Sequence, residues 1–475
     1  MTPTSLVPPP VLFEGRLWTS GEIGRLALAW RRDLSPALSA VQTPVATAMV
    51  NTPQSIALFF ALSSFQAPVI LLPPEPSEWR SSPPIPPGTR LYLTSTLAGV
   101  VRTAEGLDLD AAVLAEPGRL SHPSGDALFL TAPGVVLFTS GSTGRPKPVY
   151  KRMAQVLAMA GDLMLAAGPG SGIASALPIA RAFGFNTALM AATVTGSRLA
   201  LQERFNPRAM LDLFGTGQYH FWSGALGMAD LLSRAAPPAW KAGRPAPPAC
   251  FVGGPAPDHL ADRFEERIGA SLRQIYGATE VGTITADVRN GGQRGSVGHP
   301  LAGTRIHIGD DPRAAAPTGA TGRIWIAAPR YLMQGYGFPP NVEPREEVDG
   351  WWPTPDVGYV DDGGRLTVAG RVDDCFRTNA GQLVNTSTVS QMVEELPGVG
   401  SAVAVPVSTG NGLALGLLVE SRETAADLRR HLARNLPVWA QPHVVSMTAA
   451  LPRLSSGKID RLTCIALLED VLSGT

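Results

Sequence analysis

Short apolar runs alternate along this chain with longer segments in which apolar residues recur at helical spacing. The runs Val69–Leu72, Val135–Phe138 and Ile324–Ala327 are typical of buried strands. Met153–Leu165 has the spacing of a helix. The apolar stretch at 56–72 is broken by polar residues and a proline, so it predicts a buried helix and a strand rather than a membrane span. This alternation predicts an α/β fold.

The pattern changes near residue 371, where a charged turn at 370–374 follows an expected strand at 366–369. Beyond this turn the spacing predicts a small α+β unit, with helices over 389–396 and 428–436 and strands over 402–407 and 413–419. We therefore expect a large N-terminal domain of α/β subdomains over 1–370. A small α+β C-terminal domain follows over 371–475, and the boundary lies at 371–374.

Length and charge restrict the class of protein. The 475 residues exceed the ~250–300 at which single cores stop growing, which agrees with more than one domain. Lys+Arg and Asp+Glu both total 39, so the chain gives no reason to expect nucleic acid or a membrane as a partner. The three cysteines lack the spacing of a zinc site or a disulfide framework. The N-terminus lacks a signal-peptide pattern, and we expect a cytoplasmic protein.

A run of small residues directly follows the expected strand at 135–138 and ends in a basic segment: Thr139-Ser140-Gly141-Ser142-Thr143-Gly144, then Arg145-Pro146-Lys147. Glycines allow backbone N–H groups to converge on an anion, and Lys147 adds a charge-assisted bond to phosphate. It is not a Walker A loop, because Pro148 stands where a Ser or Thr would hold Mg²⁺. A plain surface turn is the alternative interpretation.

Further segments of the same kind follow in order: Val252-Gly253-Gly254-Pro255-Ala256-Pro257, Tyr276-Gly277-Ala278-Thr279-Glu280, Gly335-Tyr336, Trp352-Pro353-Thr354-Pro355-Asp356, Gly370-Arg371-Val372-Asp373-Asp374, and Leu451-Pro452-Arg453-Leu454-Ser455-Ser456-Gly457-Lys458. With the small-residue run, they resemble the motifs of the adenylate-forming superfamily. This group contains acyl- and aryl-CoA synthetases, nonribosomal-peptide adenylation domains and beetle luciferase. The resemblance covers nearly the whole chain and implies an AMP-forming acid–thiol ligase that uses ATP and Mg²⁺.

The resemblance also assigns roles. Lys458 bridges the attacking carboxylate and the α-phosphate, Thr279 bonds that phosphate, and Glu280 holds Mg²⁺, which suits a cation that prefers carboxylate and phosphate oxygens. The remaining ATP contacts are the small-residue run at 139–144 with Lys147, the adenine-side residues Gly254, Pro255, Tyr276 and Gly277, and the ribose or phosphate contacts Asp356 and Arg371.

Members of this superfamily run two half-reactions by rotating their small C-terminal domain. The resemblance therefore makes the C-terminal domain mobile, with Asp373 at the hinge position. Some positions depart from the usual pattern. Arg181 stands where His is usual, and Leu383 and Thr388 replace Arg and Glu after the hinge. Because these two lie next to the hinge, they bear more on thiol transfer than on adenylation.

The acid-binding residues implied by the resemblance are Arg181, Phe183, Phe185, Trp222, Gly253, Ala278 and Gly282. Aromatic walls beside small residues favour a compact aryl acid, such as a benzoate or hydroxybenzoate, and Asn186 or Ser223 is placed to meet a ring hydroxyl. A medium-chain fatty acid is the alternative. An α-amino acid is disfavoured, because no acidic residue lies between Leu177 and Leu201.

The acceptor of the acyl group is expected to be the phosphopantetheine thiol of an acyl-carrier protein or of CoA. Arg429, Arg430 and Arg434 cluster on the helix expected over 428–436 and suit an acidic carrier protein, although a merely solvated helix face is the alternative. A non-catalytic nucleotide-binding relative is a further alternative, which the presence of Lys458, Glu280, Asp356 and Arg371 together disfavours.

Overall fold

The computed structural model describes residues 6–75, 85–97, 109–114, 130–139, 146–168, 170–238, 240, 245–254, 256–288, 294–314, 319–378, 383–396, 398–410, 412–421, 425–436, 438, 441–452 and 459–473. The chain packs into two compact units. The first is Met1–Ile306 with Ala327–Trp352 and Gly364–Leu366, and the second is His307–Ile326 with Pro353–Gly363 and Thr367–Thr475.

One sheet of the first unit has nine strands within the described residues. Its order is β15 (His299–Pro300), β14 (Gly282–Ala286), β13 (Leu272–Ala278), β12 (Ala249–Gly253), β11 (Phe221–Ala225), β9 (Ile173–Ser175), β10 (Leu199–Leu201), β1 (Val11–Phe13) and β2 (Arg16–Trp18). The strands from β13 to β1 in this order run parallel, and antiparallel strands close both ends. Parallel strands place their carboxyl ends at one edge, where ligands of α/β proteins bind.

The second sheet of this unit has eight described strands. Its order is β19 (Asn341–Pro344), β18 (Gly335–Phe338), β8 (Pro148–Arg152), β7 (Gly134–Phe138), β4 (Val69–Leu72), β3 (Val45–Ala48), β5 (Thr89–Thr94) and β6 (Leu109–Leu114). Every residue of β3, β4 and β7 is buried, as expected for parallel strands with both faces covered.

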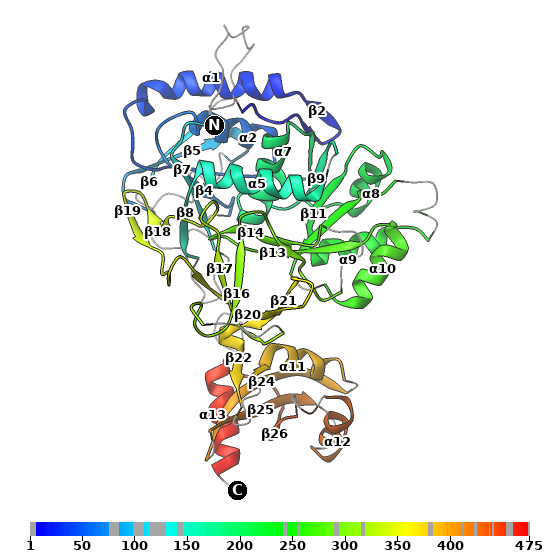
Figure 1. The fold of residues 1–475 in the computed structure, drawn as a ribbon. Coiled ribbons are helices and arrows are strands. Elements are labelled where there is room, and N and C mark those ends of the chain that lie inside the picture. The colour runs from blue at the N-terminus through cyan, green and yellow to red at the C-terminus, as the bar shows by residue number, and fades with distance from the viewer. Residues whose placement is uncertain are drawn as a thin grey trace. The chain divides into compact units, whose positions relative to one another are not determined.

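Helices cover these sheets (Figure 1). They are α1 (Ser20–Leu38), α2 (Pro53–Leu62), η1 (Ser95–Leu97), α5 (Met153–Ala167), α6 (Ala182–Gly184), η2 (Phe185–Met190), α7 (Ala191–Thr195), α8 (Pro207–Gly215), α9 (Leu226–Ala235) and α10 (Asp258–Ile268). Helix α5 contacts strands of both sheets, among them β8 and β14, so it lies where the two sheets approach each other.

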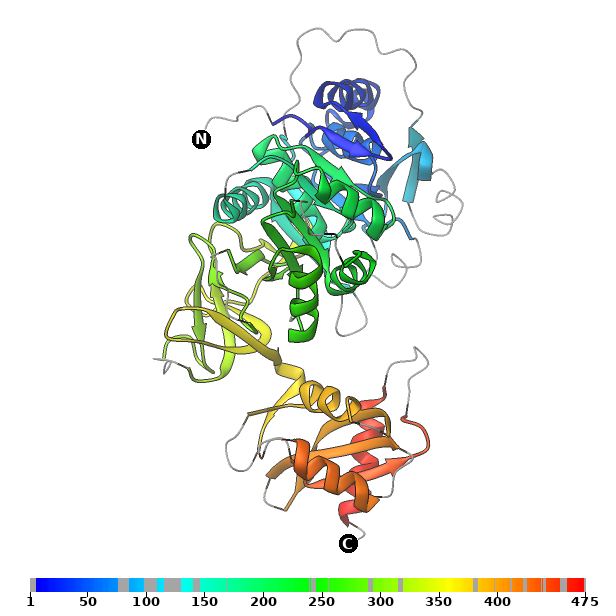
Figure 2. The ribbon, with the colours of Figure 1, turned by 90° about the vertical axis from the view of Figure 1, so that its right-hand side faces the viewer.

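The second unit contains most of a four-stranded sheet, in the order β16 (Arg305–Ile308), β17 (Gly322–Ala327), β20 (Trp352–Val360) and β21 (Leu366–Arg371). A short helix, η3 (Val372–Asp374), leads to the hairpin of β22 (Cys375–Arg377) and β23 (Leu383–Asn385). A three-stranded sheet follows, formed by β24 (Val399–Thr409), β25 (Gly412–Ser421) and β26 (Val444–Thr448). The helices that accompany it are α11 (Thr386–Glu394), α12 (Ala425–Asn435) and α13 (Arg461–Ser473) (Figure 2).

The predicted α/β class is confirmed, and so are the strands expected at 69–72, 135–138 and 324–327. The domain boundary at 371–374 stays a prediction. Within the described residues, no helix is both long and apolar enough to cross a bilayer.

Candidate active site

The small-residue run connects two antiparallel strands, β7 and β8. Phe138 pairs with Pro148, and beyond this pair Thr139 and Lys147 bond each other twice. The Thr139 N–H donates to the Lys147 carbonyl at 3.0 Å, and the Lys147 N–H donates to Thr139 Oγ1 at 2.9 Å. These bonds close the neck of the loop. Six residues between them, Ser140, Gly141, Ser142, Thr143, Gly144 and Arg145, lie outside the described residues.

Thr279 and Glu280 lie in the tight turn between β13 and β14, both partly exposed. The turn requires glycine, because a Cβ on Gly277 would lie 2.3 Å from the Gly282 carbonyl oxygen. Gly282 itself has a φ of +97°, a conformation that L side chains rarely adopt. The sequence motif therefore places its two polar residues at the carboxyl end of a sheet strand.

Contacts from β18 and the segment before it hold Glu280. The Tyr336 hydroxyl donates to Glu280 Oε1 at 2.9 Å, and the Met333 N–H donates to the Glu280 carbonyl at 2.7 Å. The Lys147 ammonium lies 5.4 Å from the centre of the Tyr336 ring. Burial and the nearby Glu280 carboxylate raise the pKa of Tyr336, so its hydroxyl stays a donor at neutral pH. Tyr336 thus joins the neck of the loop to Glu280.

Lys151, which stands outside all of the sequence motifs, also reaches this turn. It is fully buried on β8, and its ammonium donates to the Val281 carbonyl. Burial lowers its pKa to about 7, and the Glu280 charge acts in the opposite direction. The only signal in the sequence was alternation, since Lys151 shares a face of the strand with the buried Val149.

Several of the residues expected beside adenine and the acid lie at or just after the carboxyl ends of β12 and β13. Gly253 faces Phe183, because a Cβ on Gly253 would lie 3.2 Å from that ring. Tyr276 is buried, whereas Gly254 has a φ of +98° and is partly exposed. Ala278 is partly exposed, and a Cβ on Gly282 would lie 3.0 Å from Met159 of α5. Pro255 lies outside the described residues.

Arg181 and the predicted aromatic walls of the acid site differ in how deeply they are buried. Arg181 precedes α6 and is partly exposed, and burial lowers its pKa. Phe185 is fully buried, edge-to-face with Phe59 at 5.4 Å. Trp222 is fully buried between Phe214 of α8 and Phe264 of α10. Core packing accounts for Phe185 and Trp222, and their contact with an acid stays a prediction.

Two polar residues lie near these walls. Asn186 is 2% exposed, and its Oδ1 atom has no hydrogen-bond partner among the described residues. It belongs to the π-helical segment η2, a type of helix found frequently at functional sites. Ser223 Oγ is already bonded to Thr187 Oγ1 at 3.0 Å. Asn186 is therefore the better acceptor for a ligand hydroxyl.

The second unit holds the other predicted nucleotide contacts. Arg371 Nη1 lies 3.9 Å from Asp356 Oδ1, and the Asp356 N–H donates to Thr354 Oγ1 at 3.2 Å. Asp373 is exposed on η3, whereas the adjacent Asp374 pairs with Arg461 at 3.2 Å. Lys458 lies outside the described residues.

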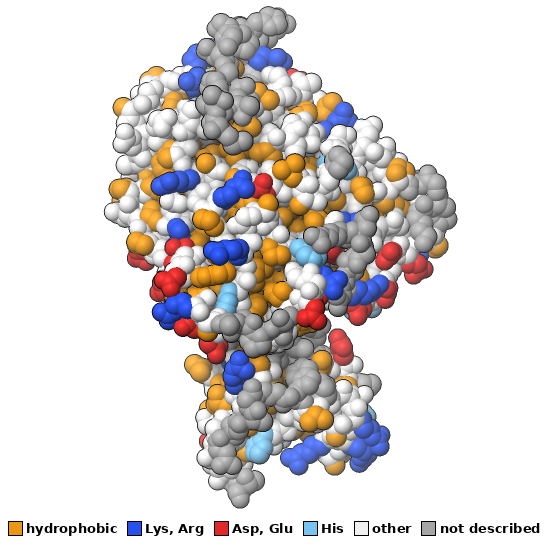
Figure 3. All heavy atoms as spheres, viewed as in Figure 1, with side chains coloured by type: hydrophobic (Ala, Val, Ile, Leu, Met, Phe, Trp, Pro, Cys, Tyr) orange, Lys and Arg blue, Asp and Glu red, His pale blue; other side chains and the backbone are white. Residues whose placement is uncertain are grey.

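Helix α12 of the second unit presents basic side chains to solvent. Arg429, Arg430 and Arg434 are all exposed, and basic side chains gather over this helix in Figure 3. Arg430 pairs with Asp427 at 3.1 Å, one turn earlier. On the opposite face Leu428 and Leu432 pack into the core of the unit. The helix is therefore amphipathic, with a cationic outer face.

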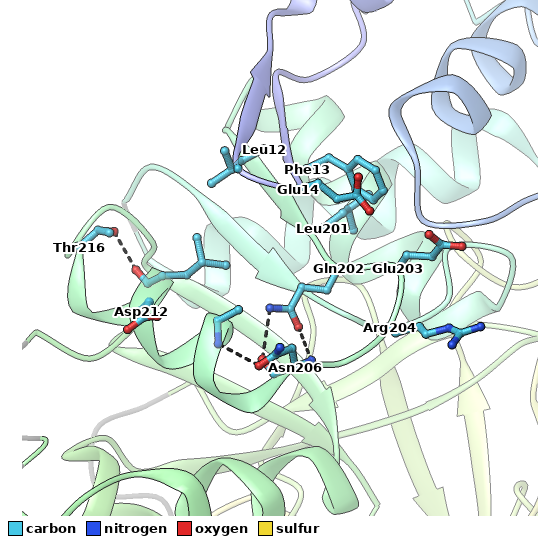
Figure 4. A pocket seen from close by; sticks show the side chains of 13 residues that line it. Leu12, Phe13, Glu14, Leu201, Gln202, Glu203, Arg204, Asn206, Asp212 and Thr216 are labelled. Atoms are coloured by element: carbon cyan, nitrogen blue, oxygen red, sulfur yellow. Dashed lines mark hydrogen bonds between the residues drawn. The ribbon is translucent and has the colours of Figure 1, made fainter. Parts of the chain in front are cut away.

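A cavity of about 530 Å³ lies elsewhere in the first unit (Figure 4). It is lined by the end of β1, the end of β10 and helix α8, including Leu12, Leu201 and Leu213. No predicted ATP or acid residue lines it. The side-chain oxygens of Gln202 and Asn206 accept hydrogen bonds from neighbouring backbone N–H groups, so these oxygens already have partners within the protein.

The family model described as AMP-binding enzyme matches residues 101–337. A sulfoacetate–CoA ligase of Cupriavidus necator is 29% identical over 70% of this chain and 66% of its own length. A 4-chlorobenzoate–CoA ligase of an Arthrobacter species is 27% identical over 88% and 84%. A fatty acid–acyl-carrier-protein ligase, ScoC of Streptomyces coeruleorubidus, is 30% identical over 41% and 39%.

Solved structures share the fold over nearly the whole chain. ATP-bound MatB from Rhodopseudomonas palustris superimposes with a TM-score of 0.76, at 18% identity, over 98% of this chain and 97% of its own. The O-succinylbenzoate–CoA synthetase MenE from Bacillus subtilis, in complex with ATP and magnesium, gives a TM-score of 0.75 at 20% identity over 98% and 97%.

Proposed function

This chain belongs to the adenylate-forming superfamily of AMP-binding enzymes, and we propose that it activates a carboxylic acid with ATP and then transfers the acyl group to a thiol. The observation that carries this proposal is the convergence of the loop neck and the β13–β14 turn. Lys147 approaches the Tyr336 ring, and Tyr336 bonds Glu280. A phosphate-binding loop next to a fixed carboxylate is what Mg²⁺-dependent attack on a phosphate requires.

The residues present suit ATP and Mg²⁺. Tyr336 occupies Oε1 of Glu280 and leaves the other carboxylate oxygen for a cation. Mg²⁺ usually takes one or two carboxylates together with substrate phosphates and waters. Asp356, close to Arg371, has two acceptor oxygens to offer the ribose hydroxyls. When bound, Mg²⁺ would neutralise phosphate charge, while Thr279 would bond the α-phosphate and Lys147 would bond phosphate.

Lys458 is assigned to the first half-reaction. A carboxylate that attacks the α-phosphate brings two anions together, and an ammonium between them lowers this repulsion. After adenylation, rotation about Asp373 would present the opposite face of the C-terminal domain for thiol transfer.

The acid that the site supports best is a compact aryl acid, such as a benzoate or hydroxybenzoate. Phe183 packs over Gly253 and is only partly buried, so its ring offers an aromatic wall against which a flat ring packs well. The unpaired Asn186 Oδ1 is an acceptor for a ring hydroxyl. A medium-chain fatty acid is the second candidate, because a fatty acid–carrier-protein ligase is among the relatives.

The test is pyrophosphate release with ATP, Mg²⁺ and a panel of benzoates, hydroxybenzoates, C6–C12 fatty acids and amino acids. We expect the highest kcat/KM with a benzoate or hydroxybenzoate. A clear preference for the fatty acids would overturn the aryl assignment. ATP binding with no release of pyrophosphate from ATP, whichever acid is added, would instead indicate a non-catalytic nucleotide-binding relative.

A further inference from the structure

Lys151 is a fully buried lysine that no part of the proposed chemistry uses. It lies on β8 of the eight-stranded sheet, and its ammonium bonds the Val281 carbonyl, just before β14 of the nine-stranded sheet. The side chain therefore crosses from one sheet to the other. Burying an ammonium is costly unless it is hydrogen-bonded and near an opposite charge, so an apolar residue would stabilise a plain sheet contact more simply.

The bond that Lys151 makes is next to Glu280 in the chain. The Glu280 carbonyl accepts from the Met333 N–H at 2.7 Å, its carboxylate accepts from Tyr336 at 2.9 Å, and the following peptide accepts from Lys151. These three hydrogen bonds thus fix the backbone and side chain of Glu280 and the carbonyl of the next residue, Val281.

We propose that Lys151 is a positioning residue that, from beneath the β13–β14 turn, holds Glu280 in the orientation in which it binds Mg²⁺ with ATP. This inference rests on the proposed function. Because the Lys151 side chain is fully buried, we assign it no direct contact with nucleotide or metal. It acts through Glu280 by fixing the turn with its bond to the Val281 carbonyl.

The experiment measures the factor by which MgCl₂ strengthens ATP binding, using calorimetry on the full chain. The proteins are wild type, Lys151→Met, Glu280→Gln and the double variant. Methionine keeps most of the length of the lysine side chain but loses its charge and its donors. We expect Lys151→Met and Glu280→Gln each to lower the magnesium factor by about fivefold or more, and the double variant to lower it no further than Glu280→Gln alone.

A matched control is Thr285→Val on β14. Thr285 is fully buried, and its hydroxyl donates to the Val297 carbonyl at 2.6 Å, so the variant also removes one buried bond to a backbone carbonyl. We expect it to lower the melting temperature and leave the magnesium factor unchanged. If Lys151→Met does not fold, Lys151→Gln, with a neutral donor, replaces it in the same comparison.

Two outcomes would overturn the inference: a magnesium factor in Lys151→Met equal to that of wild type, or effects of the two substitutions that multiply in the double variant. The ligase assignment is tested separately. Magnesium-dependent ATP binding without activity on any acid would overturn the ligase assignment, and the magnesium factors of the variants would still decide the role of Lys151. Wild-type ATP affinity that is indifferent to magnesium would overturn both.

Discussion

At the scale of single residues, the main requirement is to bring a carboxylate and a polyphosphate together. We expect Lys458→Ala to lower adenylate formation by about 100-fold or more, because it removes the cation assigned to the space between the two anions. Thiol transfer from a pre-made acyl adenylate should remain largely normal. The measurements are pyrophosphate release for the first half-reaction and thioester formation for the second.

The control for this prediction is Arg453→Ala, which removes a cation from the same motif without touching Lys458. It should leave both half-reactions near normal. Pyrophosphate release by Lys458→Ala at close to the wild-type rate would contradict the role assigned to this lysine.

Asn186 permits a prediction that links stability to specificity. Its buried Oδ1 lacks a partner among the described residues, and an unpaired buried acceptor costs ~1–3 kcal/mol. Asn186→Leu should therefore raise the melting temperature of the unliganded protein. It should also lower the preference for hydroxybenzoate over benzoate by about tenfold, because the partner of the ring hydroxyl is lost. Thermal melting and kcat/KM ratios test both parts.

Thr193→Val on α7, the helix after η2, is the matched control. It removes a buried hydroxyl that donates to the Leu189 carbonyl at 2.8 Å. It should destabilise the protein and leave the preference unchanged. If Asn186→Leu keeps the wild-type preference, Asn186 does not contact the ring substituent.

Some residues of the candidate site can be predicted from the sequence, and others cannot. Thr139, Lys147 and Glu280 are recognisable because they stand in local motifs, and the structure brings Lys147 and Glu280 together through Tyr336. Lys151 was missed because a lysine in isolation is expected at the surface. Its burial follows from the approach of a second sheet, which the pattern of a single strand does not encode.

At the scale of elements, periodicity is informative wherever burial is uniform. Strand β4 coincides with the apolar run at 69–72, and α5 begins at the expected Met153. Short elements are harder to predict. Strands β1, β2 and β10 have three residues each, so their assignment depends on pairing with distant strands rather than on a local pattern.

The hinge is a prediction about one short element, η3. Proline fixes φ near −65° and restricts the residue before it, so Asp373→Pro should limit any rotation about this segment. We expect adenylation to remain within about twofold of wild type and thioester formation to fall by about tenfold or more. Asp373→Ala, which removes the carboxylate but leaves φ free, should spare both half-reactions. Equal losses in both half-reactions of Asp373→Pro would identify a folding or binding residue instead.

At the scale of the whole molecule, the division into units has a chemical counterpart. The first unit holds the loop neck, Glu280 and the predicted acid walls, and the second holds Asp356 and Arg371. Closure of one part of a protein on another completes the site of many enzymes, and the rotation predicted about Asp373 is a motion of this kind.

The basic face of α12 bears on whether the acyl acceptor is a carrier protein or CoA. We expect an acyl-carrier protein to be at least as good an acceptor as CoA, because Arg429, Arg430 and Arg434 present an exposed positive surface. Such contacts steer acidic partners and weaken with salt.

Replacing these three arginines with glutamine should raise KM for an acidic carrier protein by about tenfold, since exposed charges contribute ~0.2–1 kcal/mol each. Turnover with CoA and pyrophosphate release should stay unchanged, and the effect should shrink at high salt. Glutamine at the exposed Arg16, Arg32 and Arg234 makes the same charge change elsewhere and should have no effect. Robust turnover with CoA and none with any carrier protein would show that the basic face of α12 is only a solvated surface.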